Sequence, residues 1–158
     1  MSQTAVMTSI AILKTSLWKF LATILTLVLL ATLSLAAQIH QPGRGSPERR
    51  AILEAIRSSI ETQMNGPVEF VITTIKSDGE WALVIAEPQR PGGAAIDAEE
   101  TTFAGKSDEM DGLTVYALAR KQDGDWSHVT DIVGSMDVAY LGWAEEYGVP
   151  GALLGLEQ

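Results

Sequence analysis

The sequence predicts an α+β domain: an N-terminal helix packed on a four-stranded antiparallel sheet made of two hairpins, with a short C-terminal helix. Three observations predict it. A capped amphipathic segment covers residues 47–64, two pairs of strand-like runs are each joined by an Asp-Gly turn, and helical periodicity returns over 137–147. Because no helix separates the strands within a pair, the pattern favours an antiparallel sheet over a doubly wound parallel one, and this sheet is expected to be covered on one face.

The first helix has clear start and stop signals. Ser46 can cap it, Pro47 suits the first helical position, and Glu48 suits the positive end of the helix dipole. The apolar residues recur at three-to-four spacing: Ile52, Leu53, Ile56, Ile60 and Met64. The following Asn-Gly-Pro ends the helix, with Gly66 expected in the left-handed conformation.

The strand-like runs cover 68–76 with 81–87, and 113–121 with 126–133. Each turn reads Asp-Gly-acid-Trp, which is an order that a twisted hairpin favours. On a regular last strand, His128 and Asp131 face opposite sides, so they form a pair only if a bulge intervenes.

Two segments follow no strong pattern of their own. Residues 88–112 form a long connection rich in Gly, Pro and acids, with a short helix or strand expected over 98–103. Connections of this length are either functional or mobile, and both alternatives stay open. In the tail, a helix over 137–147 places Tyr140, Trp143 and Tyr147 on one face.

The N-terminus predicts export. Residues 20–37 are uncharged and follow Lys14 and Lys19, the order of a secretory signal peptide with cleavage before Ala37 or Gln38. A helix of this length reaches about 27 Å, so an uncleaved inner-membrane anchor with the domain outside is the alternative. The chain is thus divided into a signal peptide or anchor over 1–37, a flexible tether over 38–46 and a single domain over 47–158. Membrane contact is expected only through residues 20–37.

Composition excludes several classes of function. The chain has 11 Lys+Arg against 20 Asp+Glu, which argues against a nucleic-acid partner. The lack of cysteine excludes a disulfide scaffold, a thiolate metal site and a cysteine nucleophile. No cofactor is expected.

Few residues offer catalytic chemistry. His40 and His128 are the two imidazoles, which is too few for a histidine-rich metal site. The acids near Gly112 do not fit an EF-hand, because that alignment puts Leu118 where the bidentate glutamate belongs. No metal site or catalytic residue is therefore assigned. The sequence favours a binding protein over an enzyme.

Aromatic residues either complete a small core or supply the candidate binding surface. They are grouped with one histidine as residues that could line a groove between the sheet and the C-terminal helix: Trp81, Trp126, His128, Tyr140 and Trp143.

The arrangement of helix and antiparallel strands resembles the cystatin-like and nuclear-transport-factor-like folds. The runs RRAILEAIR, PVEFVITTI, WALVIAEP, DGLTVYALAR, DGDW and DVAYLGWAEEYGVP also look like a pattern of exported bacterial proteins of uncharacterised activity. The resemblance implies a fold and an exported location, but no activity and no site residue. Protease inhibition of the cystatin type would need a glutamine-valine-glycine loop, which this sequence lacks.

Three functions remain open. The first is an exported, non-enzymatic interaction module whose protein or small-molecule partner meets the 88–112 loop or the aromatic groove. The second is a small-ligand carrier or enzyme that uses the concave sheet, with His128, Asp131 or Tyr116 as polar groups. The third is a membrane-tethered structural accessory domain of the cell envelope.

Overall fold

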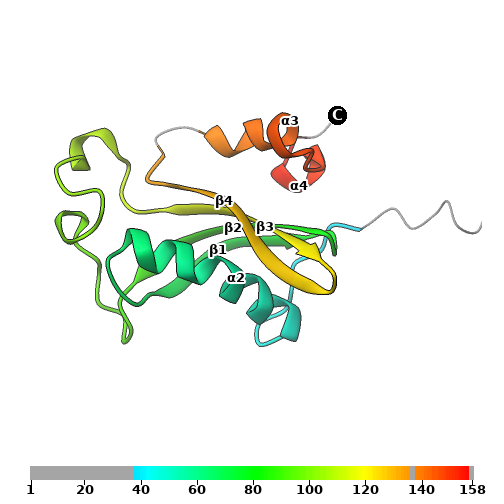
Figure 1. Ribbon diagram of the computed structural model, residues 1–158, viewed down its shortest axis with the longest axis horizontal. Coiled ribbons are helices and arrows are strands. Elements are labelled where there is room, and N and C mark those ends of the chain that lie inside the picture. The colour runs from blue at the N-terminus through cyan, green and yellow to red at the C-terminus, as the bar shows by residue number, and fades with distance from the viewer. Residues whose placement is uncertain (1–37, 136–137, 157–158) are drawn as a thin grey trace, which may run out of the picture. The chain divides into compact units, whose positions relative to one another are not determined.

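The computed structural model describes residues 38–135 and 138–156, so the signal or anchor predicted over 1–37 lies outside the described residues. The main elements follow one another as predicted. They are α2 (Pro47–Gln63), β1 (Glu69–Ser77), β2 (Trp81–Gln89), β3 (Val115–Gln122) and β4 (Asp125–Val133). Figure 1 shows α2 on one side of the sheet and the C-terminal helices on the other. Within the described ranges, no helix is long and apolar enough to cross a membrane.

The sheet is a meander of antiparallel strands in the order β1-β2-β3-β4, which confirms the predicted α+β class. The two hairpins join through β2 and β3, which pair from Trp81 opposite Arg120 to Ala86 opposite Val115. The register shifts once in each outer strand, at Thr73 in β1 and at Val129 in β4. The two inner strands pair with each other without a shift.

Helix α2 begins as predicted. The Oγ of Ser46 accepts a hydrogen bond from the Arg49 amide at 3.1 Å, and Pro47 occupies the first turn. At the other end, Asn65 is the residue in the left-handed conformation, with φ 52°, so the expectation for Gly66 was wrong. Asparagine tolerates this region better than most side chains, so Asn65 adopts the left-handed conformation that was expected of Gly66.

The two Asp-Gly turns differ in geometry despite their similar sequences. At the second turn, Asp123 and Gly124 both have positive φ, 53° and 97°, which is the type I′ pattern. At the first turn, the Asp78 carboxylate instead accepts from the amides of Glu80 and Trp81, at 2.9 and 2.6 Å. The shared order of residues therefore reflects the needs of each turn and not one common shape.

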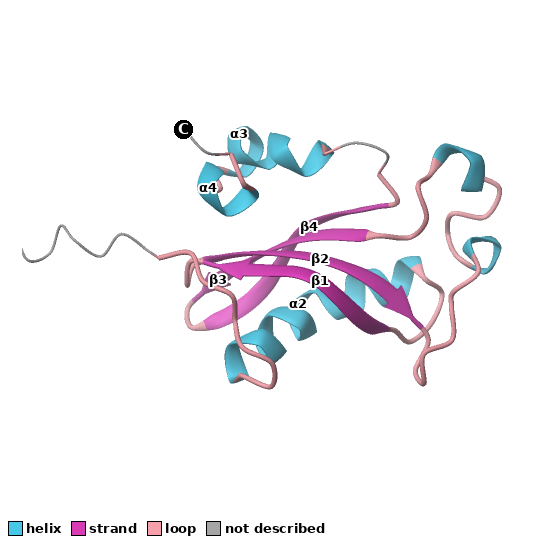
Figure 2. Cartoon of the chain, turned by 180° about the vertical axis from the view of Figure 1, so that it is seen from behind, coloured by secondary structure: helices cyan, strands magenta, loops and turns pink. Residues whose placement is uncertain are grey.

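The sheet has an apolar core on each face. The helix-side core joins α2 to the sheet through fully buried aliphatic residues, among them Ile52, Ile56, Ile60, Val84 and Ala117. The C-terminal core lies on the other face and contains Trp81, Leu83, Leu118, Trp143, Val149, Leu153 and Leu154. The sheet is thus covered on both faces, whereas the sequence predicted cover on one (Figure 2).

The C-terminal cover is made of short pieces where one helix over 137–147 was predicted. A 3₁₀ turn, η3 (Ala139–Gly142), leads into α3 (Trp143–Tyr147), and α4 (Gly151–Leu154) follows. Gly148 ends α3 in the left-handed conformation, at φ 72°. Because the chain turns at Gly148, both Trp143 of α3 and the α4 leucines reach the same apolar core.

The segment expected to be a flexible tether over 38–46 contacts the domain. His40 forms an antiparallel bridge with Ser77, with N···O distances of 2.8 and 2.9 Å. The ring Nε2 of His40 lies 2.9 Å from the Glu48 carboxylate, which also accepts from the Ser77 hydroxyl at 2.9 Å. The 38–46 segment, the start of α2 and the end of β1 are therefore joined at one point.

These contacts shift two pKa values. The hydrogen bond to Glu48, followed by that to the Gln38 carbonyl, raises the pKa of His40 above its ordinary 6.5. Burial raises the pKa of Glu48, but the hydrogen bonds from His40 and Ser77 outweigh it, so this pKa lies below its ordinary 4.5. The His40 contribution is complete below about pH 6.5 and is lost as pH rises through the raised pKa; the Glu48 contribution is lost as pH falls through the lowered one.

Attachment of the 38–46 segment is thus expected to be firmest between these two pKa values. Measured by NMR, the His40 ring should titrate above 6.5, and the protection factor of the Ser77 amide, which corrects for the base catalysis of exchange, should fall as the pH rises through that titration. Glu48→Gln should return the His40 pKa toward 6.5. Glu54→Gln, which removes a carboxylate that pairs with Arg57 instead, should leave it unchanged. Identical titrations in all three proteins would contradict the assigned pairing.

Candidate binding pocket

The connection between β2 and β3 is anchored on the end of α2. The amide and hydroxyl of Thr102 both donate to the Gln63 carbonyl, at 2.9 and 3.0 Å. The guanidinium of Arg90 donates to the Met64 carbonyl at 2.9 Å. The last carbonyls of a helix have no partner within the helix, so this long connection supplies the partners that α2 lacks.

The anchored connection has local order of its own. As predicted for this region, a short helical turn forms, η1 (Ala98–Glu100), and the Asp97 carboxylate caps it by accepting from the Glu99 amide at 3.0 Å. The Glu99 carboxylate in turn accepts from the Gly105 amide, at 3.0 Å for the shorter contact. These hydrogen bonds give the segment local structure, and its function stays a prediction.

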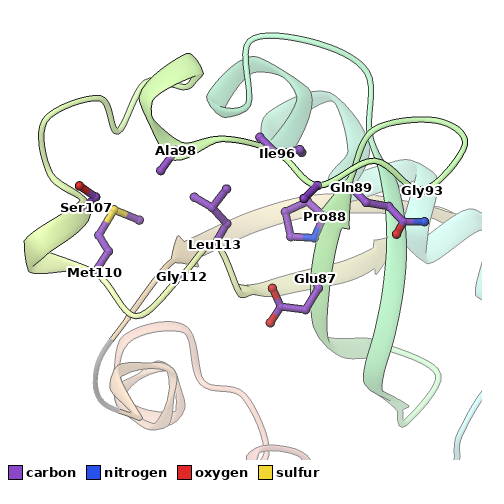
Figure 3. Close-up of a pocket in the computed structure, with 11 residues that line it drawn as sticks. Glu87, Pro88, Gln89, Gly93, Ile96, Ala98, Ser107, Met110, Gly112 and Leu113 are labelled. Carbon is purple, nitrogen blue, oxygen red and sulfur yellow. The ribbon is translucent and has the colours of Figure 1, made fainter.

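A pocket of about 430 Å³ opens between this loop and the end of β2 (Figure 3). Most of its wall is apolar. The lining residues are Glu87, Pro88, Gln89, Gly93, Ala95, Ile96, Ala98, Ser107, Met110, Gly112 and Leu113. The sequence pointed to the loop but missed these residues; the isolated apolar Ile96, Met110 and Leu113 in a polar stretch are the signal that could have found them.

The pocket has one charged lining residue, and its charge is engaged elsewhere. The Glu87 carboxylate accepts a short hydrogen bond from the Thr114 hydroxyl. In Figure 3 this carboxylate is directed away from Ile96 and Ala98. Because the remaining lining is apolar or neutral, the pocket suits an apolar group rather than acid-base chemistry.

One wall of the pocket depends on Gly134, the residue that follows the end of β4. Gly134 donates to the Thr114 carbonyl at 2.9 Å and accepts from the Asp111 amide at 3.1 Å. It has φ 64°, and a Cβ at this position would lie 2.6 Å from the Gly112 carbonyl oxygen and still closer to the Met110 side chain. The loop can therefore approach the sheet only where residue 134 has no side chain.

Gly134→Ala is accordingly expected to destabilise the fold and displace Met110 from the pocket wall. Gly105→Ala is the matched control, because Gly105 also has positive φ, 74°, but no neighbouring atom within 4 Å of a Cβ. In urea unfolding, Gly134→Ala should lose at least about 1 kcal/mol more than Gly105→Ala, since it adds overpacking to backbone strain. Equal losses would show that the loop does not approach Gly134 closely.

The five candidate residues from the sequence do not line one groove, because they lie on opposite faces of the sheet. Trp81, Tyr140 and Trp143 pack in or against the C-terminal core, whereas Trp126 packs against the helix-side core. His128 shares the helix side with Trp126, as its contact with Asp131 beside α2 shows.

The aromatic residues on the C-terminal face contact each other. Tyr140 stacks on Tyr116 with ring centroids 5.2 Å apart and meets Trp143 edge-on at 6.2 Å. The guanidinium of Arg120 lies 4.7 Å from the Trp81 ring centroid. Since Trp81 and Trp143 are also buried, this group packs the sheet against the C-terminal segment.

The bulge in β4 brings His128 and Asp131 together. Leu118 lies opposite Thr130 and the next residue, Ala119, opposite His128, so Val129 is the extra residue. The alternation predicted for a regular strand therefore fails beyond His128. The pair forms through the alternative that required a bulge, with His128 Nε2 2.7 Å from Asp131 Oδ1.

Metal ligation finds no support in the described ranges. No group of three or more histidine and acidic side chains there could hold a metal ion.

Comparison of the chain with protein-family models, with curated proteins and with solved structures finds no match. The resemblance to cystatin-like and nuclear-transport-factor-like folds therefore stays a prediction, and the candidate function rests on the pocket geometry alone.

Proposed function

We propose that this chain is an exported, non-enzymatic binding module that holds an apolar group of its ligand or partner in the pocket between β2 and the 90–114 loop. The observation that carries the proposal is the ordered, mostly apolar wall of that pocket. Its volume of about 430 Å³ falls within the range of small-molecule sites. An apolar group placed there would gain roughly 25 cal/mol for each Å² removed from water.

Other features support a binding role. The loop is tied to the end of α2 by Thr102 and Arg90, so the pocket wall is formed before any ligand arrives. A preformed site avoids the entropy cost of ordering a loop on binding. The single carboxylate in the wall accepts a hydrogen bond from Thr114, and no second acid or base lines the pocket to act with it.

Filling the pocket tests the proposal. N-phenyl-1-naphthylamine, an uncharged apolar dye, should bind the native protein with a rise in fluorescence. Ala98→Trp places a bulky side chain in the pocket wall and should weaken dye binding at least about fivefold, roughly 1 kcal/mol. Ala104→Trp is the control, because Ala104 is an exposed residue of the same loop outside the lining.

Dye binding that both variants leave unchanged would place the dye elsewhere and contradict the proposal. An absence of dye binding to the native protein would do the same.

We infer export from residues 20–37, an uncharged run preceded by two lysines. The intact mass of the protein recovered from the producing cell checks the inference. A mass that starts at Ala37 or Gln38, in the periplasm or medium, supports a cleaved signal peptide. A complete chain in the membrane fraction supports the alternative of a tethered envelope domain. A complete, soluble chain in the cytosol would contradict both.

A further inference from the structure

A second pocket lies beside the His128–Asp131 pair, away from the loop. It encloses about 450 Å³ between α2 and β4. Its lining is small and polar, and consists of Ala55, Ser58, Ser59, Thr62, Gln63 and His128. None of these residues is an acid, a lysine or an arginine, so the hydrogen-bonding groups decide what the pocket can hold.

The donors of this cluster converge on one carboxylate. Asp131 is only 7% exposed and accepts from the Ser59 hydroxyl at 2.7 Å, from His128 Nε2 at 2.7 Å and from the Gln63 amide at 2.5 Å. The same amide nitrogen lies 3.4 Å from the Ser59 oxygen. The donors of this cluster therefore all have acceptors within it: both N–H groups of Gln63, the Ser59 hydroxyl hydrogen and the His128 Nε2–H.

What remains is a set of acceptors. In the tautomer that directs Nε2–H at Asp131, the ring of His128 offers Nδ1 as a lone pair. The Gln63 side-chain oxygen is a second acceptor. Among the residues that the structure describes, none donates to either atom. The Thr62 hydroxyl gives its hydrogen to the Ser58 carbonyl at 2.8 Å, so its lone pairs also stay available.

The net charge of the domain favours a cation. Residues 38–158 contain nine basic and twenty acidic side chains. The Asp131 carboxylate lies directly behind the lining, although most of its surface is shielded by its three donors. A pocket of acceptors in a negative field attracts groups that both donate hydrogen bonds and carry positive charge.

We propose that the pocket between α2 and β4 is a binding site for a small organic cation of the ammonium type, which donates N–H hydrogen bonds to His128 Nδ1, Gln63 Oε1 and Thr62 Oγ1. Asp131 acts as a positioning residue, because it fixes the tautomer of His128 and the amide orientation of Gln63. The site is independent of the apolar pocket at the loop, so either proposal can fail alone.

Three probes of matched shape test the chemistry: propylammonium, 1-propanol and propionate. In NMR titrations at constant ionic strength, propylammonium should shift the His128 ring signals and the Ser58 and Thr62 amides with a saturating curve. The neutral alcohol should bind at least threefold more weakly, and propionate should produce no saturating shift. A cation attracted only by the general acidity of the surface would instead give small, spread and non-saturating shifts.

Two variants locate the site. Thr62→Val keeps the side-chain shape but removes the hydroxyl acceptor, and should weaken propylammonium binding at least threefold. His128→Phe keeps a ring but removes Nδ1, and should weaken it further. Ser127→Ala is the control, because Ser127 is the exposed neighbour of His128 in β4 and does not line the pocket.

The proposal is overturned if propylammonium gives no saturating shift at these residues, or if propanol or propionate binds as well. It is also overturned if Thr62→Val leaves the affinity unchanged. Because Thr62→Val retains His128 and Asp131, its affinity for propylammonium tests the proposal even if His128→Phe does not fold.

Discussion

The strand β2 must be shielded from water on both faces, and most of the architecture follows from this requirement. Its residues alternate between Ala82, Val84 and Ala86 toward α2 and Trp81 and Leu83 toward the C-terminal segment. Burying one large aliphatic or aromatic side chain contributes about 1.5–3 kcal/mol, so neither face can be left open without a large loss. A single helix covers one face of a sheet, and the short C-terminal helices therefore complete the fold.

The sequence predicted those features that depend on neighbouring residues. Ser46 and Pro47 mark the start of α2 by local hydrogen bonding and local geometry, and the Asp-Gly pairs mark the turns for the same reason. The continuous apolar run WALVIAE was the signal that β2 is buried on both faces, and the prediction of cover on one face missed it.

Features that depend on distant residues could not be predicted in this way. The β4 bulge orients Asp131 toward Ser59 and Gln63 while Val129 packs against the C-terminal core, and no local signal specifies that combination. The pocket at the loop likewise needs the close approach of residues 110–112 to Gly134. In a one-dimensional pattern, this glycine looks like any other glycine at a strand end.

Gln63 contacts the surroundings of both pockets, through different atoms. The Gln63 carbonyl accepts from Thr102 and so holds the loop that forms the apolar pocket. Its side-chain amide donates to Asp131 beside the polar pocket. Main-chain and side-chain groups thus act separately, and a substitution at this position that keeps the helix intact leaves the loop anchor in place.

Both outer strands, β1 and β4, carry a bulge, and the pairing of the two inner strands has none. An open sheet exposes backbone groups along its margins, where a further chain can add and begin a fibril. A bulge twists such a margin and breaks the regular spacing that an added strand needs. These two irregularities therefore oppose edge-to-edge pairing between copies of this small domain without requiring a closed barrel.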